Sequence, residues 1–168
     1  MATIFTESFE TDGNGTRYTT SVPEFSDGSG DFFTRTDGSN IGSFYDVTGA
    51  EGSFFFAAQD IDGEVPDSLQ TLTFSSIDIS GASNLSFSAL FAEDDDGSNQ
   101  DWDAPDFVKV EYEIDGGGFQ NLLAFENDGN TFNSAPFQDT DFDGTGDGIE
   151  VTESFSAFSS AIASTGST

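Results

Sequence analysis

Cysteine and histidine are both absent from this sequence of 168 residues. The absence of cysteine excludes disulfide bonds and thiol chemistry, and the absence of histidine removes the commonest general base. Neither a G-x-S-x-G nucleophile motif nor a phosphate-binding glycine loop occurs. Paired carboxylates, which a glycosidase needs, carry no weight here, because 32 acidic residues place some pair at any separation. We therefore expect a protein without catalytic activity.

Basic residues are also scarce. Only 3 Lys and Arg residues stand against 32 Asp and Glu, which gives a formal net charge of -29. A nucleic-acid-binding protein needs a basic patch that displaces phosphate counterions, so we expect no nucleic-acid partner. Anionic membrane surfaces repel such a chain, and no apolar run is long enough to span a bilayer, so we expect no membrane insertion. No signal peptide is recognisable, which fits either an intracellular protein or a piece of a longer secreted chain.

Phenylalanine and glycine are abundant, at 20 and 19 residues. Several segments alternate between apolar and polar residues and are separated by Asp-Gly or Asn-Gly turn signals, which is typical of short strands. The predicted strands cover residues 31–36, 53–59, 84–91, 107–114 and 119–125. Each predicted strand has one polar side that faces solvent and one apolar side that faces a core. This pattern indicates antiparallel sheets stacked as a sandwich. We predict an all-β fold and a single domain over residues 1–168.

One twelve-residue stretch, 139–150, fits the calcium-loop pattern D-x-[DN]-x-[DN]-G-x5-E at every specified position. Such loops bind Ca²⁺ through side chains at the first, third, fifth and twelfth places, a carbonyl at the seventh and a water at the ninth. The pattern predicts metal ligands at Asp139, Asp141, Asp143, Thr145, Asp147 and Glu150. Two carboxylates about 4 Å apart repel by about 4 kcal/mol at an effective dielectric near 20, and a dication removes that repulsion. The alternative is a solvated acidic turn.

The residues on either side of this loop decide what kind of site it is. Four apolar residues follow it at helical spacing: Val151, Phe155, Phe158 and Ile162. With Thr152 as a cap, they predict one short C-terminal helix. Residues 131–138 contain a proline and no helical period, and Gly146 stands where sensor loops usually carry a β-branched residue. We therefore interpret the loop as a structural calcium site on a β-protein and not as a paired helix-loop-helix sensor.

A weaker ion ligand is Glu7. Residues 3–9 are predicted to form a first strand, and Glu7 shares its core-facing parity. A carboxylate in that position needs a cation, which is either a metal ion or one of Arg17 and Arg35. The alternative places Ile4 inward and Glu7 in water.

A second weak ion site follows the strand predicted at 53–59. Asp60 and Asp62 lie close together in the acidic run that ends this strand. They predict either a second ion site or an ordinary acidic turn.

The only tryptophan, Trp102, lies in an acidic loop over residues 92–106. With Asp101 and Asp103 it forms either a platform for a sugar ring, where the acids accept bonds from hydroxyls, or a lid over the edge of the sheets. A third interpretation is another calcium site shared by two loops. All three remain open from the sequence.

Four stretches resemble a family of jelly-roll accessory domains: 7–18 (ESFETDGNGTRY), 33–38 (FTRTDG), 56–62 (FAAQDID) and the loop from Asp139. Such domains occur in large secreted or cell-surface proteins of marine bacteria and cyanobacteria, beside lamin-tail-like, extracellular endonuclease or calcium-repeat modules. The resemblance implies a galactose-binding-like sandwich, an extracellular setting, neighbouring domains and a supporting role. It also implies a C-terminal truncation, because the family continues into a further strand beyond residue 168.

The leading hypothesis is a non-catalytic, calcium-binding sandwich module of an exported bacterial protein. It serves adhesion or binds a carbohydrate or other substrate, with a glycan or another surface protein as partner. One alternative is an accessory domain of a secreted hydrolase or nuclease whose catalytic domain lies elsewhere. A passive spacer in a surface protein is the other.

Overall fold

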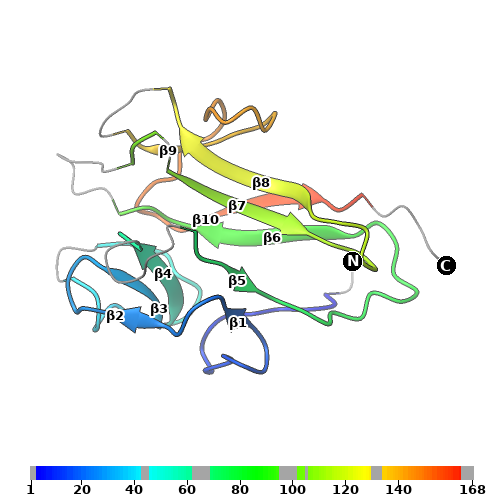
Figure 1. The fold of residues 1–168 in the computed structure, drawn as a ribbon, viewed down its shortest axis with the longest axis horizontal. Helices are drawn as coiled ribbons and strands as arrows, with labels where there is room; N and C mark the ends of the chain where they lie inside the picture. The colour runs from blue at the N-terminus through cyan, green and yellow to red at the C-terminus, as the bar shows by residue number, and fades with distance from the viewer. Residues whose placement is uncertain are drawn as a thin grey trace. The chain divides into compact units, whose positions relative to one another are not determined.

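The computed structural model describes residues 3–42, 46–61, 69–94, 102–104, 106–129 and 134–163. These residues form ten strands and no helix, and all strand pairs are antiparallel (Figure 1). The predicted all-β class with antiparallel sheets is thus confirmed. Among these residues, no helix exists that is able to cross a membrane.

By its contacts the chain divides into two compact units. The first unit comprises Met1–Tyr45 with Ala50–Ser80, and the second unit comprises Asp46–Gly49 with Gly81–Thr168. Each unit has sheets and a hydrophobic cluster of its own, and we describe them separately. A single domain over 1–168 stays a prediction.

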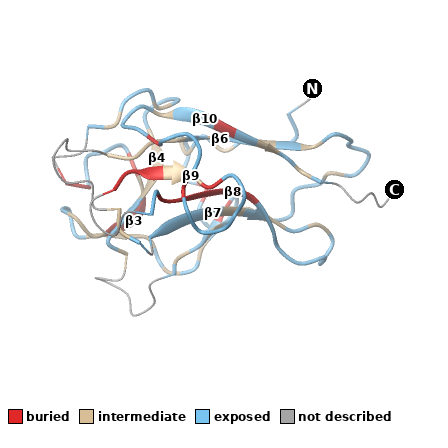
Figure 2. Ribbon diagram, turned by 90° about the horizontal axis from the view of Figure 1, so that it is seen from above, coloured by how far each residue is buried: buried red, intermediate tan, exposed pale blue. Residues whose placement is uncertain are grey.

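The first unit has five short strands in two sheets. They are β1 (Thr19–Thr20), β2 (Phe25–Ser26), β3 (Phe32–Thr36), β4 (Phe55–Gln59) and β5 (Leu72–Thr73). The strand order is β2-β3-β4 in one sheet and β1-β5 in the other. The central strand β3 is buried along most of its length, as Figure 2 shows in red.

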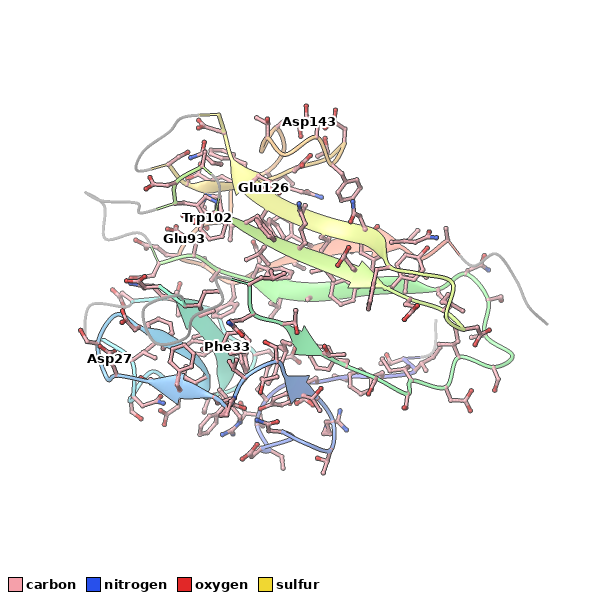
Figure 3. All side chains as sticks on the ribbon, viewed as in Figure 1. Asp27, Phe33, Glu93, Trp102, Glu126 and Asp143 are labelled. Atoms are coloured by element: carbon pink, nitrogen blue, oxygen red, sulfur yellow. The ribbon has the colours of Figure 1, made fainter. Side chains whose placement is uncertain are left out.

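Aromatic rings fill the core of the first unit. Tyr18 is 2% exposed, and its ring makes edge contacts with Phe9, Phe56 and Phe74 at centroid distances of 5.6, 6.1 and 6.2 Å. Phe33, labelled in Figure 3, meets Phe56 at 4.9 Å. Edge contacts of this kind are worth about 0.5–1.5 kcal/mol each beyond the buried area. The phenylalanine-rich composition is therefore used as ring packing.

Residues 3–9 do not form the predicted strand. Glu7 nevertheless lies on the predicted face, with a side chain that is 7% exposed, whereas Ile4 is 46% exposed. The Glu7 carboxylate accepts hydrogen bonds from Arg17 Nε at 2.5 Å and from the N–H of Phe9 at 2.7 Å. Phe9 has a φ of 60°, which ends any extended conformation there. Hydrogen bonds from an arginine side chain thus hold this segment in place of pairing with a neighbouring strand.

Arg35, on β3, holds the next part of the N-terminal segment. Its guanidinium donates to the carbonyls of Phe9 and Glu10 and lies over the Phe54 ring, 3.7 Å from the centroid. The Glu10 carboxylate accepts from the N–H groups of Ser53 and Phe54 at 2.6 and 2.7 Å, and these bonds hold the pKa of Glu10 below its usual value. Two arginines therefore fix a segment that has no strand partner.

The second unit has five strands in two further sheets. They are β6 (Ser86–Phe91), β7 (Phe107–Tyr112), β8 (Gln120–Asn127), β9 (Pro136–Gln138) and β10 (Ser156–Ala161). The orders are β7-β8-β9 and β10-β6. The strands predicted at 107–114 and 119–125 are confirmed and form a hairpin: β7 pairs with β8, with a register shift between Val110 and Glu111.

Three rings join the two sheets of the second unit. Phe125 of β8 lies 4.7 Å from Phe91 of β6 and 5.0 Å from Phe158 of β10, centroid to centroid. Leu123 and Val151 complete the buried cluster. Leu122, Ala124 and Glu126, on the opposite face of β8, are buried as well, so this strand is covered on both sides.

The predicted C-terminal helix over 151–162 is wrong, because residues 156–161 form the strand β10. Phe158 is 5% exposed, and the residues two and four places further on, Ser160 and Ile162, are partly buried. This is the alternation of a strand, and it shares two of its apolar positions with the helical spacing. Pairing with β6 satisfies the backbone, whereas a serine-rich segment has little intrinsic preference for a helix.

Candidate metal site

The candidate metal loop, residues 139–148, is a hairpin loop. It joins β9 to a returning segment, 149–151, that runs antiparallel beside β9 (Figure 1). Two hydrogen bonds link the legs at the base: from Gln138 N–H to the Ile149 carbonyl and from Val151 N–H to the Pro136 carbonyl, both 2.9 Å. Asp139 N–H donates to the Ala124 carbonyl of β8, also at 2.9 Å. Strand pairing therefore positions the loop, in place of the entering and leaving helices of a sensor.

Asp139 is the buried centre of the loop, with 1% of its surface exposed. Its Oδ1 accepts from the N–H groups of Phe142 at 2.6 Å and Asp141 at 3.3 Å, and its Oδ2 accepts from Gly144 at 2.9 Å. Gly144 has a φ of 91°, a conformation that favours glycine and explains the residue at this place. The loop is thus wrapped around one carboxylate, and no basic side chain takes part in these bonds.

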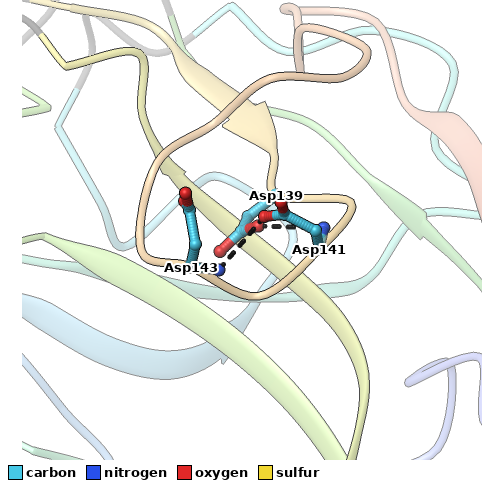
Figure 4. Close-up of side chains that lie close together, drawn as sticks. All are labelled: Asp139, Asp141 and Asp143. Atoms are coloured by element: carbon cyan, nitrogen blue, oxygen red, sulfur yellow. Dashed lines mark hydrogen bonds between the residues drawn. The ribbon is translucent and has the colours of Figure 1, made fainter.

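Three carboxylates meet at this point. Asp139, Asp141 and Asp143 each offer an oxygen within 4.8 Å of the others. Figure 4 draws the three side chains close together on the loop. Calcium binds oxygens at 2.3–2.6 Å, so oxygens on opposite sides of one ion are about 5 Å apart. Asp143 N–H donates to Asp141 Oδ1 at 3.3 Å and Thr145 N–H to Asp143 Oδ1 at 3.0 Å, which orients both exposed side chains. One ion can therefore contact all three groups.

The remaining predicted ligands lie elsewhere on the loop. Thr145 contributes its N–H to the turn and is exposed. Asp147 accepts from the N–H and the hydroxyl of Thr140 at 2.9 and 2.8 Å, and these bonds hold the pKa of Asp147 below its usual value. Glu150 is exposed at the bridge to Phe137. Among the described acids, only the three aspartates form a group able to share an ion.

Gly146 and Gly148 continue the glycine spacing that begins at Gly144, and the calcium pattern specifies only Gly144. A Cβ at Gly146 would lie 2.5 Å from the Glu126 carbonyl oxygen and 2.6 Å from Phe137 Cβ, and one at Gly148 would be 2.8 Å from backbone oxygen. The glycines therefore let the loop lie against β8 and β9. Close packing explains Gly146 at the place where sensor loops carry a β-branched residue.

The weaker predicted ligands do not join this group. Glu7 is paired with Arg17, as described above. Asp60 is exposed at the end of β4, with a φ of 44°. Asp62 lies outside the described residues.

Trp102 is partly buried, and its main chain is well anchored. Its carbonyl accepts from Ser134 N–H at 3.2 Å and from Asn127 Nδ2 at 2.9 Å. The indole nitrogen is shielded from solvent and has no hydrogen-bond partner within the part of the chain that the structure describes. Asp103 N–H donates to Asp106 Oδ2 at 2.9 Å, and Asp101 lies outside the described residues. A shielded nitrogen does not present a donor to a ligand in solution.

The donor set decides which ions the loop suits. Every side-chain ligand on offer is a carboxylate oxygen, and the chain has neither histidine nor cysteine. Carboxylate, carbonyl and water oxygens suit hard cations such as Ca²⁺, Mg²⁺ and Mn²⁺, whereas zinc sites usually include nitrogen or sulfur.

No family model, curated protein or solved structure matches this chain. The resemblance to jelly-roll accessory domains therefore stays a prediction.

Proposed function

We propose that this chain is a non-catalytic calcium-binding module and that the loop over 139–150 holds one Ca²⁺ ion. The observation that carries the proposal is the buried Asp139 carboxylate, which faces Asp141 and Asp143 with no basic side chain in the group. A buried charge needs a partner, and three carboxylates at this spacing repel one another. A dication among them supplies the partner and removes the repulsion.

Calcium fits this loop better than magnesium. Magnesium demands near-ideal octahedral geometry, whereas calcium accepts six to eight oxygens in an irregular shell. The three aspartates supply part of such a shell, and the Thr145 carbonyl and water supply further oxygens in this proposal. Asp147 and Glu150 complete it only if their side chains turn from the positions described above.

The two sheets of the second unit are, in this proposal, the layers of a sandwich of jelly-roll type. The proposal is supported by the shared hydrophobic cluster, to which both sheets contribute: Phe87 and Phe91 from β6, Phe158 from β10, Leu123 and Phe125 from β8. Sandwiches bury side chains between two antiparallel sheets in this way. The loop lies outside that cluster and follows the C-terminal end of β9. An ion bound there stabilises the hairpin without disturbing the core.

The proposed setting is an exported or cell-surface bacterial protein, in which the module supports adhesion or carbohydrate binding. Extracellular calcium modules bind with dissociation constants of about 10⁻⁴ to 10⁻³ M. An ion of that affinity is bound where calcium is millimolar. The site is then permanently occupied and stabilises the fold, and it does not act as a regulatory switch. The position of the loop on paired strands supports such a structural role.

Thermal unfolding with and without calcium tests the proposal. With a Kd of about 10⁻⁴ M, 10 mM calcium is 100 times Kd and adds about 2.7 kcal/mol of stability. For a chain of this length, we expect Tm to rise by about 5–10 °C relative to a sample in chelator. Magnesium at the same concentration serves as the control for a general effect of divalent cations.

Matched variants locate the effect. Asp141→Ala with Asp143→Ala removes two of the three carboxylates and should abolish the calcium-dependent rise in Tm. Glu111→Ala with Glu113→Ala removes two exposed acids from outside the loop. This control variant should show the same calcium-dependent rise in Tm as the parent. An equal rise with magnesium, or an undiminished rise in the Asp141/Asp143 variant, contradicts the assignment.

A further inference from the structure

The three basic side chains of the chain are all used in internal contacts. Arg17 pairs with Glu7 and lies over the Phe5 ring, 5.0 Å from its centroid. Arg35 is held by backbone carbonyls and an aromatic ring. Lys109 lies 3.4 Å from Glu126 Oε1 and 4.6 Å from the centroid of Phe107. These positive charges are therefore committed within the molecule.

The acidic side chains obtain their hydrogen bonds mainly from backbone N–H groups. Asp37 accepts from Ser39, Asp78 from Ser80, and Glu113 from the N–H of Gly118. An amide N–H satisfies a carboxylate oxygen but carries no net charge, so it leaves the repulsion between carboxylates in place. Across the described residues only two ion pairs occur, against a formal net charge of -29.

We propose that the chain reaches its full stability only in a medium of high ionic strength, where mobile monovalent cations supply the countercharge that its own side chains do not. A net charge far from zero destabilises a compact chain through self-repulsion. The screening length is about 10 Å at 0.1 M salt and about 3 Å at 1 M, so concentrated salt confines repulsion to nearest neighbours. One calcium ion in the loop leaves nearly all of this charge uncompensated, so the requirement is separate from the calcium site.

The second unit carries the stronger requirement. It contains most of the acidic residues of the chain, and Lys109 is its only basic residue, whereas the first unit contains both arginines. The single tryptophan, Trp102, belongs to the second unit. Its fluorescence therefore reports on the unit in which the salt effect is expected to be larger.

The experiment is thermal unfolding of the full chain in chelator, followed by Trp102 fluorescence, between 0.05 and 1 M NaCl. Chelator keeps the metal loop empty, so the outcome does not depend on the calcium proposal. We expect Tm to rise by about 5 °C or more over this range, because the screening length shortens about threefold or more. KCl should give the same rise, since screening depends on ionic strength and not on the ion.

A charge variant separates screening from other effects of salt. Glu111, Glu113 and Glu153 are exposed residues of the second unit. Glutamine at all three positions removes charge and keeps the oxygen that accepts from Gly118. This variant should have a higher Tm than the parent at 0.05 M NaCl and a smaller rise toward 1 M. A Tm that is flat or falls with salt, or an equal rise in parent and variant, overturns the proposal.

Discussion

The two units hold their buried carboxylates in different ways. In the first unit, the Glu7 side chain is 7% exposed and is neutralised by Arg17 at 2.5 Å. In the second unit, Asp139 is 1% exposed and is held by three backbone N–H groups beside two further aspartates. The first arrangement carries its own countercharge. The second arrangement contains no countercharge of its own, and in the proposed function a bound cation supplies it.

The contrast lies in the loop rather than in the second unit as a whole. Lys109 and Glu126 form an internal pair there at 3.4 Å, and the Glu126 side chain is 8% exposed. The strand β8 that carries Glu126 also supports the loop, through the Ala124 carbonyl. The neighbouring strand β7 therefore supplies a cation, Lys109, to the buried carboxylate of β8, whereas the loop beside β8 offers only amides to Asp139.

Removing Arg35 is the strongest test of the self-contained arrangement. In Arg35→Ala the carbonyls of Phe9 and Glu10 lose a charged donor and Phe54 loses its stacked guanidinium, so we expect a loss of about 3 kcal/mol in the free energy of unfolding. Urea denaturation followed by circular dichroism measures it. Arg35→Lys keeps the positive charge but lacks the planar guanidinium group. Its free energy of unfolding should lie between those of the parent and the Ala variant. A parent-like midpoint for Arg35→Ala would show that the arginine does not hold this segment.

Two asparagine substitutions in the loop should act in opposite directions in chelator. Asp139→Asn replaces one acceptor oxygen by a donor, which leaves a loop N–H without its partner and costs about 2 kcal/mol. Asp143→Asn keeps an oxygen for Thr145 N–H and removes one repelling charge, so it should be neutral or stabilising by about 0.5 kcal/mol. With calcium present, Asp143→Asn should gain less stability than the parent. Equal losses in chelator for both variants contradict a repelling cluster.

The smallest effect concerns Glu10, where the first unit also uses amides. Hydrogen bonds from Phe54 and Ser53 lower its pKa in the folded state. A lowered pKa contributes stability that is present above the unfolded value of about 4.3 and is lost as the pH falls through the folded value. We expect Glu10→Gln to weaken the loss of stability below about pH 4, measured as urea midpoints in 1 M NaCl. If the urea midpoints of Glu10→Gln fall with decreasing pH as steeply as those of the parent, these hydrogen bonds do not favour the ionised form of Glu10.

Alternation and turn chemistry were sufficient to predict the parts of the fold in which one face is dry. Alternating apolar residues over 107–114 predict β7, and the glycine-rich turn before 119–125 predicts its partner β8, although β8 is buried on both faces. Residues 3–9 show the same parity but form no strand, because the donors come from Arg17 and Arg35, which are distant in sequence. Sequence reasoning leaves Glu7 either inward or in water and names Arg17 and Arg35 as possible partners, but it does not predict that arginine hydrogen bonds take the place of strand pairing.

The C-terminal helix was mispredicted for a related reason. Phe158 and Ile162 are four residues apart, a spacing that suits one helical face and also one strand face. The decision between them lies in β6, which pairs with the whole of β10. In the loop, the pattern predicted the three aspartates that come together, whereas the hydrogen bonds of Asp147 with Thr140 and the packing of Gly146 depend on neighbours that the pattern does not include.

The hydrogen bonds at the base of the loop have a mechanical consequence. The legs on either side of the loop pair antiparallel, so a pull on the two chain ends loads this hairpin from its open end. Its bonds then break one after another toward the loop, and the three aspartates are reached last. In the proposed calcium-bound state, the ion is therefore released only after the hairpin has opened.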